Sequence, residues 1–383
     1  MPHHFDVIVL GGGTMGSAAA WALAKRGAST LVLEQFRHVH DRGAHGGRTR
    51  IIRHAYAEGA DYVPLVQRAD QLWRELEAES GRRILHRTGG LELSAPNFSH
   101  ARRARASAEA HGLPYEWLSP AEASRRWPAF TVPEDWDVLF SPDAGFLLTE
   151  PAITALGKVA RRRGVLIHEE EPAREWGADE RGVWVRTDHD TYHADRLIVT
   201  AGAWAGRVLA DLGLPVTTVR KVLFWLAVDD PGNFAPDRFP VFISESDDGE
   251  IYGFPIHDSS GLKIANHAGG TPTDPDAVDR TVRPGEEADV VALARQLLPT
   301  VSNRVSESTV CLYAMTPDTD FILDRHPRWP RVIVGAGFSG HGFKFATAIG
   351  EHLANLALDA DAAPLSPLAL ARFNPATAVS TVA

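Results

Sequence analysis

The chain has 383 residues, 44% of them hydrophobic and 23% charged, and its net charge is −10 at pH 7. The length predicts about two domains, and the composition is typical of a soluble globular protein. The negative charge and the lack of a long Lys/Arg block argue against a nucleic-acid partner, and no apolar run approaches the roughly 20 residues of a membrane span.

The compartment is indicated by two further features. An apolar run begins at residue 5, which leaves no room for a signal peptide. The single cysteine, Cys311, excludes intrachain disulfides and fits a reducing compartment. We therefore expect a cytoplasmic protein without membrane or nucleic-acid partners.

Residues 5–35 have the pattern of a β-α-β unit. An apolar run leads into Gly11, Gly13 and Gly16 in a Gly-x-Gly-x-x-Gly motif, an Ala-rich helical segment follows, and a second apolar run ends at Glu34. Gly11 permits a sharp turn, Gly13 the close approach of a pyrophosphate, and Gly16 the packing of helix on strand. Glu34 can accept hydrogen bonds from a ribose 2′-hydroxyl. The unit predicts an adenine dinucleotide site; the alternative is a Gly-rich turn in another α/β fold.

The next segment, up to residue 141, begins with a loop rich in His, Arg and Gly. It leads into a stretch where Arg50 and Arg53 flank an apolar pair, and these bases serve either a cofactor or the protein surface. Apolar spacing and start signals predict helices over 64–80 and 99–112, a strand over 89–93 and a helix start at 119–122.

From residue 142 the α/β pattern returns. We predict a helix over 150–164, a strand over 165–168, a hairpin from 182–185 and 191–195, and a buried strand that runs into Ala201 and Gly202. Small residues at this strand end allow a backbone to approach a bound dinucleotide closely, although an ordinary strand end has the same pattern. Together with the first unit, it favours a flavin protein over a nicotinamide dehydrogenase.

Residues 219–315 contain several β-rich runs separated by Pro, Asp and Gly, which predict an antiparallel sheet with one helix over 286–298. A buried strand over 331–337, a glycine-rich loop and a helix to about residue 358 complete the chain. The fold class is therefore α/β (mixed α+β), with a Rossmann-like FAD-binding domain and a second domain on a large, mostly antiparallel sheet. The predicted FAD-binding domain comprises 1–88, 142–218 and, with the C-terminal tail, 319–383; the predicted substrate domain comprises 89–141 and 219–318.

Five motifs in this order resemble the monomeric sarcosine oxidase / N-methyl-L-tryptophan oxidase family of D-amino-acid-oxidase-like FAD-dependent oxidoreductases. They are Gly-Gly-Gly-Thr-Met-Gly at 11–16, the 49–56 stretch, Tyr-Gly-Phe-Pro at 252–255 with Leu-Lys-Ile at 262–264, Val-Cys-Leu-Tyr at 310–313, and the 337–345 loop. The resemblance spans almost the entire chain. It implies an FAD enzyme of the amine oxidase type.

The resemblance implies a role for each matching residue. Cys311 corresponds to the cysteine that bonds covalently to the flavin, its alternative being a small buried apolar residue. Arg53 and Lys344 correspond to the two cations that hold the substrate carboxylate. Lys263 corresponds to the lysine beside which oxygen is reduced. For Lys344 and Lys263 the alternative is a lysine that points to solvent.

The same resemblance implies the rest of the site. Arg50 corresponds to a second cation near the flavin, and Tyr252, His267 and Tyr313 to residues that border the substrate, with a purely structural core role as their alternative. Backbone N–H groups of the 337–342 loop would face the flavin. The expected cofactor-binding residues are Gly11, Gly13, Thr14, Met15, Gly16, Glu34, Gln35, Thr49, Arg50, Ala201, Gly202, Trp204, Cys311, Gly337, Ser339, Gly340, His341, Gly342 and Lys344. No metal site is expected.

The chain departs from the family pattern in two places. Where sarcosine oxidase has His-His-Gly-Asp, this chain has His45, Gly46, Gly47 and Arg48, so one flavin-side histidine is missing and an acid has become a base. The 219–225 and 266–270 runs are more similar to the N-methyltryptophan oxidase pattern. The size of the substrate is therefore open.

The expected function is an FAD-dependent oxidase of N-methyl amino acids that yields formaldehyde, the primary amino acid and hydrogen peroxide. Its partners would be a small secondary amino acid and oxygen, and it would act as a monomer. The alternatives are an oxidase of a cyclic or larger secondary amino acid such as a proline- or pipecolate-like compound, a dehydrogenase that passes electrons to a quinone or partner flavoprotein, and a dinucleotide-binding protein without catalysis.

Overall fold

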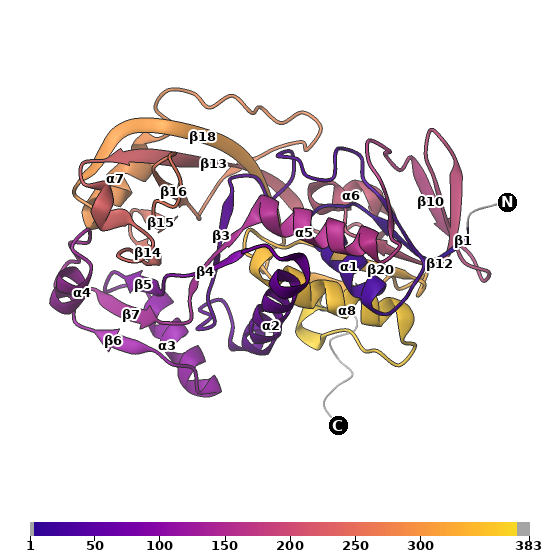
Figure 1. The fold of residues 1–383 in the computed structure, drawn as a ribbon, viewed down its shortest axis with the longest axis horizontal. Coiled ribbons are helices and arrows are strands. Elements are labelled where there is room, and N and C mark those ends of the chain that lie inside the picture. The colour runs from indigo at the N-terminus through magenta and orange to yellow at the C-terminus, as the bar shows by residue number, and fades with distance from the viewer. Residues whose placement is uncertain (1–3, 374–383) are drawn as a thin grey trace.

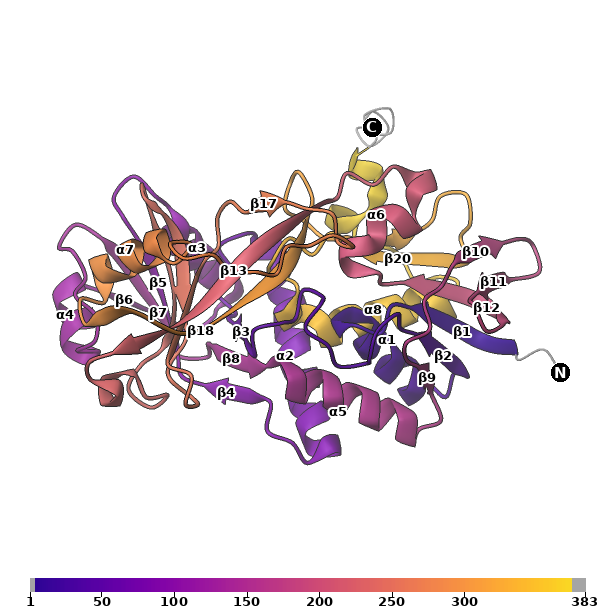
Figure 2. The same cartoon turned by 90° about the horizontal axis from the view of Figure 1, so that it is seen from above.

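The computed structural model describes residues 4–373 and contains an eight-stranded, a nine-stranded and a three-stranded sheet (Figure 1). The two large sheets lie toward opposite ends of the molecule, and the strands β13 (Thr217–Val228) and β18 (Val301–Met315) reach from one toward the other (Figure 2). This mixed arrangement of helices and sheets confirms the expected α/β class. We propose that the two large sheets mark the two predicted domains.

The eight-stranded sheet is built around β1 (His4–Leu10). This strand pairs in parallel with β2 (Thr30–Leu33) and β12 (Thr191–Val199), and the sheet continues in parallel to β9 (Leu166–His168) and β20 (Val332–Ala336). Antiparallel neighbours are β10 (Glu175–Ala178), β11 (Val183–Arg186) and β19 (Ile322–Arg325). The central strands are almost fully buried, as expected for a parallel sheet covered on both faces.

Four helices pack together into a layer beside this sheet. They are α1 (Thr14–Lys25), α2 (Val63–Ser80), α5 (Thr149–Arg162) and α8 (Ala346–Leu358). The alanines of α1 leave little side-chain bulk, so α1 packs directly on α8 and α5. The first turn of α1 is thereby fixed at the carboxyl end of β1.

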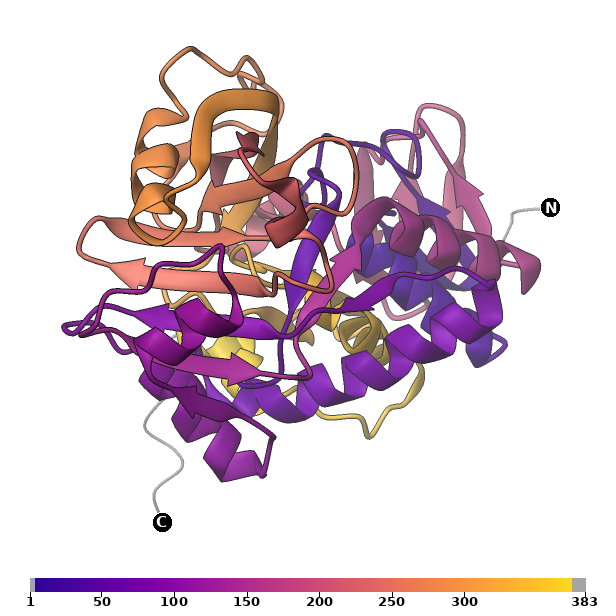
Figure 3. The ribbon, with the colours of Figure 1, turned by 60° about the vertical axis from the view of Figure 1, so that its left-hand side comes forward.

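The nine-stranded sheet is mostly antiparallel. Its order is β17 (Thr271–Pro272), β13, β16 (Leu262–Asn266), β15 (Gly249–Gly253), β14 (Val241–Ser246), β5 (Gly90–Ser94), β7 (Asp137–Ser141) and β6 (Glu116–Leu118), with β18 also paired to β13. The β14–β5 pair is parallel, which the sequence did not predict. Figure 3 shows α7 (Ala288–Leu297) beside β18, and α3 (His100–His111) and α4 (Pro120–Arg126) complete this part.

A small sheet of β3 (Thr49–Ile52), β8 (Gly145–Leu148) and β4 (Leu85–Arg87) lies between the two large sheets. It contains the segment with Arg50 and places it next to the nine-stranded sheet. The predicted helices, the hairpin of β11 and β12, and the helix start at Ser119, whose hydroxyl accepts the Glu122 N–H, are confirmed. No helix within residues 4–373 is long and apolar enough to cross a membrane.

Candidate active site

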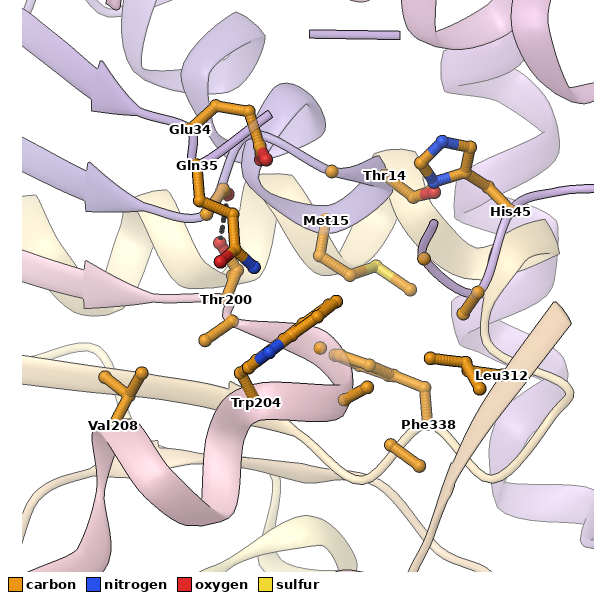
Figure 4. Close-up of a pocket in the computed structure, with 18 of the residues that line it drawn as sticks. Thr14, Met15, Glu34, Gln35, His45, Thr200, Trp204, Val208, Leu312 and Phe338 are labelled. Atoms are coloured by element: carbon orange, nitrogen blue, oxygen red, sulfur yellow. Dashed lines mark hydrogen bonds between the residues drawn. The ribbon is translucent and has the colours of Figure 1, made fainter. Parts of the chain in front are cut away.

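The larger of two adjoining cavities lies at the carboxyl ends of β1, β2 and β12 and has a volume of about 360 Å³. Figure 4 shows Glu34 and Gln35 at one end and His45 at the other, with Met15 and Trp204 between them. The expected cofactor-binding residues that line it are Gly11, Gly13, Thr14, Met15, Glu34, Gln35, Arg50, Ala201, Gly202, Trp204, Gly340 and Gly342.

The glycine turn has the shape that a pyrophosphate needs. A Cβ on Gly16 would lie 1.8 Å from the Gly11 carbonyl oxygen, so only glycine allows α1 to pack this close to the turn. A Cβ on Gly13 would meet open space, which leaves room for a ligand. No side chain of the described residues caps the first turn of α1, so its N–H groups and the helix dipole are directed at that space.

Glu34 lies at the end of β2, where the sequence predicted the ribose-binding acid. Its carboxylate accepts hydrogen bonds from the backbone N–H groups of Gly12 at 2.7 Å and Phe36 at 2.9 Å. Burial raises the pKa of Glu34 to about 7, against these backbone hydrogen bonds, which lower it. The carboxyl group is held rigidly beside the turn and can accept a hydroxyl.

His45 supplies an unpaired polar atom to the same cavity. Its Nε2 atom is buried and has no hydrogen-bond partner among residues 4–373. Burial lowers the pKa of His45 to about 3, so the ring is neutral. An uncapped helix end, a glycine turn, an acid and an unpaired ring nitrogen together fit an adenine dinucleotide with a polar ring system.

The smaller cavity, of about 50 Å³, adjoins the first and shares Arg50, Tyr313, Gly340 and Phe343 with it. Of the residues with an expected catalytic role, it is lined by Arg50, Arg53, Tyr252, His267, Tyr313 and Lys344. Arg50, Tyr252 and Tyr313 lie on β3, β15 and β18, Arg53 and His267 follow β3 and β16, and Lys344 lies in the short 3-10 helix η5 (Phe343–Phe345). The fold thus brings together six of the residues that the sequence singled out.

Arg53 is buried in the smaller cavity and already paired with carboxylates. Its Nη2 atom donates to both carboxylate oxygens of Glu58 at 2.6 Å, and its Nε lies 3.6 Å from Glu92. Burial lowers the pKa of Arg53, but the charges of Glu58 and Glu92 raise it above its usual value. The guanidinium therefore stays charged, and its Nε has no hydrogen-bond partner within the described chain.

Lys344 is also buried, so the alternative of a surface lysine is wrong. Its Nζ donates to the His341 carbonyl at 2.9 Å and to the Tyr56 hydroxyl at 3.3 Å. Because the Thr319 carbonyl accepts from His341 Nε2, the Nδ1 of that ring accepts from Tyr56. Burial, assisted by the charge of Arg53, lowers the pKa of Lys344 to about 7. A chain of hydrogen bonds thus holds an ammonium group that is close to losing its proton.

Lys263 is fully buried, so the alternative of a solvent-facing lysine is wrong here too. Its Nζ donates to the carbonyl oxygens of Gly47 (2.6 Å) and Thr49 (2.8 Å) and to the Thr49 hydroxyl (3.0 Å). Burial and the charge of Arg50 lower its pKa well below the usual value. Three acceptors around one nitrogen match the three donors of an ammonium group. The side chain lines neither cavity, and its expected role at the oxygen site stays a prediction.

Cys311 is fully buried on β18, directly opposite Lys221 of β13. Burial raises the pKa of its thiol, while the charges of Arg50, Lys263 and Lys221 lower it. The thiol does not line the larger cavity, but its neighbours Leu312 and Tyr313 do. Its expected bond to the flavin stays a prediction.

Five of the expected cofactor-binding residues contribute in other ways or lie behind the walls of the two cavities. Gly16 packs α1 on β1, and the Ser339 hydroxyl accepts from the Thr316 backbone N–H. Those that line neither cavity are Gly16, Thr49, Cys311, Gly337 and Ser339. Arg48, the base in place of a family acid, also lines neither; it pairs with Glu307 at 2.6 Å and lies 3.6 Å from Asp258.

Sequence reasoning missed three charged residues of the site. Glu58 and Glu250 line the smaller cavity, and Lys221 donates to the carbonyl oxygens of residues 267–269. Lys221 had a local signal, a charged residue within an apolar strand run. Glu250 had none, because its neighbours in the site come from distant segments, and Glu58, although only five residues from Arg53, lies in no motif that marks it.

Comparisons with known proteins agree with this geometry. Residues 6–356 match the family described as FAD dependent oxidoreductase. The chain is 39% identical over 363 residues to the monomeric sarcosine oxidase of Bacillus sp. (strain B-0618), covering 94% of this chain and 93% of that protein. It is 38% identical over 373 residues to the N-methyl-L-tryptophan oxidase of Yersinia pestis (strain Pestoides F), covering 96% and 99%.

Solved structures give the same result. NikD, described as an unusual amino acid oxidase essential for nikkomycin biosynthesis, is similar with a TM-score of 0.83 at 26% identity, covering 96% of this chain and 97% of NikD. The sequence matches extend over almost all of both proteins, and the glycine turn, Glu34 and the neighbouring buried cations are in place in the fold. The chain therefore belongs to the family of FAD-dependent oxidoreductases that contains monomeric sarcosine oxidase and N-methyl-L-tryptophan oxidase.

Proposed function

We propose that the protein is an FAD-dependent oxidase of N-methyl amino acids. The observation that carries this proposal is the pair of buried cations, Arg53 and Lys344, at a small cavity that adjoins the larger one. Two convergent cations in a small pocket suit one carboxylate. The overall reaction consumes the N-methyl amino acid, oxygen and water, and it yields the primary amino acid, formaldehyde and hydrogen peroxide.

The cofactor would be held by residues of the larger cavity. The first turn of α1 and Gly13 would bind the pyrophosphate, Glu34 the ribose, and His45 with Arg50 the polar ring system. When bound, the flavin would supply the two-electron oxidation of the N-methyl group and pass these electrons to oxygen. Every other requirement falls on the side chains of this protein.

Substrate binding begins with an exchange of partners at Arg53. The substrate carboxylate takes the place of Glu58 and lies between Arg53 and Lys344, which leaves the amine toward the larger cavity. Tyr252, His267 and Tyr313 enclose the rest of the molecule. Burial lowers the pKa of His267 to about 4, so this ring brings no positive charge near the amine. We propose that the pocket selects the neutral amine.

Although burial lowers the pKa of Lys263, its three acceptors favour the ammonium form, and this form would stabilise negative charge as oxygen is reduced. The Nζ atom is held by three acceptors and lies over the ring of Phe254 at 4.4 Å, so it cannot move toward solvent. This position supports oxygen over a quinone or a partner flavoprotein as the electron acceptor. Absence of peroxide during turnover in air would contradict this assignment.

A substrate panel tests the proposal. Purified protein loaded with FAD is given sarcosine, N-methyl-L-tryptophan, L-proline and L-pipecolate, and peroxide and formaldehyde are measured together. Equal amounts of both products from an N-methyl compound are expected. Peroxide without formaldehyde, from the cyclic amines alone, would instead establish the alternative class, and no flavin reduction by any amine would leave a binding protein.

Variants of the two cations make the panel specific. Lys344→Met and Arg53→Gln remove one charge each, and each is expected to lower kcat/KM for the N-methyl substrate by about 30- to 1000-fold, because a buried partner of a charge pair is lost. Arg48→Gln serves as the matched control, since Arg48 lines neither cavity. A loss in the control as large as in the two variants would contradict the assignment.

We also propose that Cys311 bonds covalently to the flavin. The thiol is buried next to Leu312 and Tyr313, which line the larger cavity, and the chain has no other cysteine. After acid precipitation, the yellow colour is expected to stay with the wild-type protein and to be released from Cys311→Ala. Release from both would show that the cofactor is held without a covalent bond.

We propose a cytoplasmic monomer as the working form. The single cysteine fits a reducing compartment, and the similarity to a protein named monomeric sarcosine oxidase supports one subunit. Sedimentation of the FAD-loaded protein at two concentrations tests this, and a mass near 42 kDa at both is expected.

A further inference from the structure

Glu250 lines the smaller cavity with a carboxylate that has no partner. It lies on β15, two residues before Tyr252, and side chains two apart on a strand share a face. No hydrogen bond or ion pair reaches the Glu250 side chain from any residue within 4–373, although its backbone carbonyl accepts from His267 at 2.7 Å. Burial and the charge of Glu58 raise the pKa of this carboxyl, while His100 and Arg53 lower it.

The other acids at this end of the cavity already have partners. Arg53 pairs with Glu58, and Glu92 accepts from His100 at 2.5 Å. Glu245, directly opposite Glu250 in the sheet, accepts from the His100 backbone N–H at 3.0 Å and lies 3.9 Å from Arg103. Among residues 4–373, Glu250 is therefore the acid at this end without a hydrogen-bond or ion-pair partner, and it lines the space that the substrate would enter. Burial lowers the pKa of the nearby Lys221, against the charges of Cys311 and Glu250, which raise it.

The position of Glu250 separates it from the reacting amine. Glu250 lies opposite Glu245, which accepts from the His100 backbone N–H, whereas Tyr252 lies opposite Ile243. The charges near Glu250 are His100, Glu58, Glu245, Arg53 and Lys221, whereas those near Tyr252 are Arg50 and Cys311. Arg50 also lines the larger cavity, so Glu250 lies toward the opposite end of the smaller one. A substrate with its carboxylate on Arg53 and Lys344 and its N-methyl group at the larger cavity would turn its side chain toward this end.

We propose that the preferred substrate is an N-methyl amino acid with a short, positively charged side chain, and that Glu250 binds this charge. The proposal rests on the proposed oxidase function and adds the substrate class. The cavity of about 50 Å³ must also hold the substrate carboxylate, so it admits only a short side chain. The positive charge of the substrate side chain would also neutralise the negative charge of Glu250. A substrate without this charge would leave Glu250 unpaired.

Binding without turnover gives the first test. The FAD-loaded protein is titrated with 4-aminobutanoate and with pentanoate, which has a methyl group in place of the ammonium group, and the change in flavin absorbance reports the Kd. We expect 4-aminobutanoate to bind about 10- to 100-fold more tightly, the range for a hydrogen bond to a charged group. In Glu250→Gln this ratio is expected to fall to about 1.

Glu245→Gln is the matched control, because it removes an equal charge from the facing strand but does not line the cavity. The ratio in this variant is expected to remain at the wild-type value. A wild-type Kd ratio near 1 would overturn the proposal, and so would an equal fall of the ratio in both variants. The wild-type measurement alone is decisive if Glu250→Gln does not fold.

Turnover distinguishes this proposal from the oxidase assignment. Nα-methyl-L-2,4-diaminobutanoate and N-methyl-L-norvaline differ only in the same ammonium-for-methyl exchange, and the first is expected to have the higher kcat/KM. If the protein oxidises sarcosine and N-methyl-L-norvaline but does not prefer the diaminobutanoate compound, the role of Glu250 is overturned. The assignment as an oxidase would still stand. Equal losses on both substrates in Glu250→Gln would also overturn it, and would connect Glu250 with the reacting amine instead.

Discussion

Among single residues, Lys344 has a charge that depends strongly on its surroundings. Its ammonium group lies in a buried pocket beside Arg53, and both conditions lower its pKa, to about 7. Below this pH the group is charged and attracts a carboxylate; above it the amine is neutral. Since the incoming carboxylate favours the charged form, the pKa of Lys344 in the complex must be higher than in the free protein.

This linkage predicts how binding of an unreactive carboxylate depends on pH. The Kd of pentanoate is expected to be constant below pH about 7 and then to rise by up to tenfold per pH unit, until the pKa of the complex is reached. Titrations of flavin absorbance from pH 6 to 9 measure it. Lys344→Met should bind more weakly and lose the slope; the same slope in this variant would assign the titration to another group.

Among the elements, α1 and α8 show how closely the framework is packed. A Cβ on Gly350 of α8 would lie 2.4 Å from the backbone of Ala18 in α1, a distance that a real side chain cannot adopt. The two helices lie this close because α1 has alanines at the contact. Their contact also fixes the helix end that would face the pyrophosphate.

Gly350→Ala is therefore expected to lower the free energy of unfolding by about 1–3 kcal/mol, as overpacking does. Denaturant titration of the FAD-free protein measures the change. Gly206→Ala, in the short helix α6 (Ala205–Val208) where a Cβ meets open space, should leave stability unchanged or raise it by up to about 1 kcal/mol. Equal losses in both variants would contradict the packing argument.

The sequence predicted elements well wherever the signal was local. The glycine turn, the Ser119 cap and the β11–β12 hairpin depend on residues that are neighbours in the chain, and all three are present. The long strand β18 was not predicted as one element. Its first half is polar and partly exposed, because it pairs only with β13 at the edge of the sheet and crosses an irregular register there.

The residues of the site also divide into those with a local sequence signal and those without one. Glu34 could be predicted, because its distance from Gly16 along the chain fixes its place at the strand end. Arg53 and Lys344 were named only from the family resemblance, and their burial appears only in the fold. Glu58 and Glu250 gave no signal, because about 190 residues separate them and only the assembled sheets bring both to one cavity.

For the whole molecule, the cofactor site connects distant parts of the fold. The larger cavity is lined by the ends of β1 and β2 and by Thr200, which follows β12, in one sheet, and by β18 of the other, so a bound dinucleotide would contact both. Figure 2 shows β18 reaching from one large sheet toward the other. A ligand that binds only the folded chain stabilises it by mass action, by about 2.7 kcal/mol at one hundred times its Kd.

Cys311→Ala is thus expected to have a Tm that rises with the concentration of added FAD. Wild-type protein that carries covalent flavin should show no such rise. Thermal denaturation over a series of FAD concentrations measures both, and flavin mononucleotide, which lacks the adenosine half that would lie near Glu34, should raise the Tm of the variant less. A Tm of the variant independent of FAD would contradict a site shared by the two sheets.

The pairing of Arg53 with Glu58 has a consequence for affinity. Because Glu58 is tethered five residues away and holds Arg53 through two hydrogen bonds, every external carboxylate competes with an internal one of high effective concentration. If the substrate carboxylate displaces Glu58 as proposed, simple anions that offer nothing further would gain little from the exchange, and we expect them to be poor inhibitors. A product that has lost its methyl group would meet the same competitor, which would speed its departure. Weak apparent binding is in this view a condition for rapid turnover.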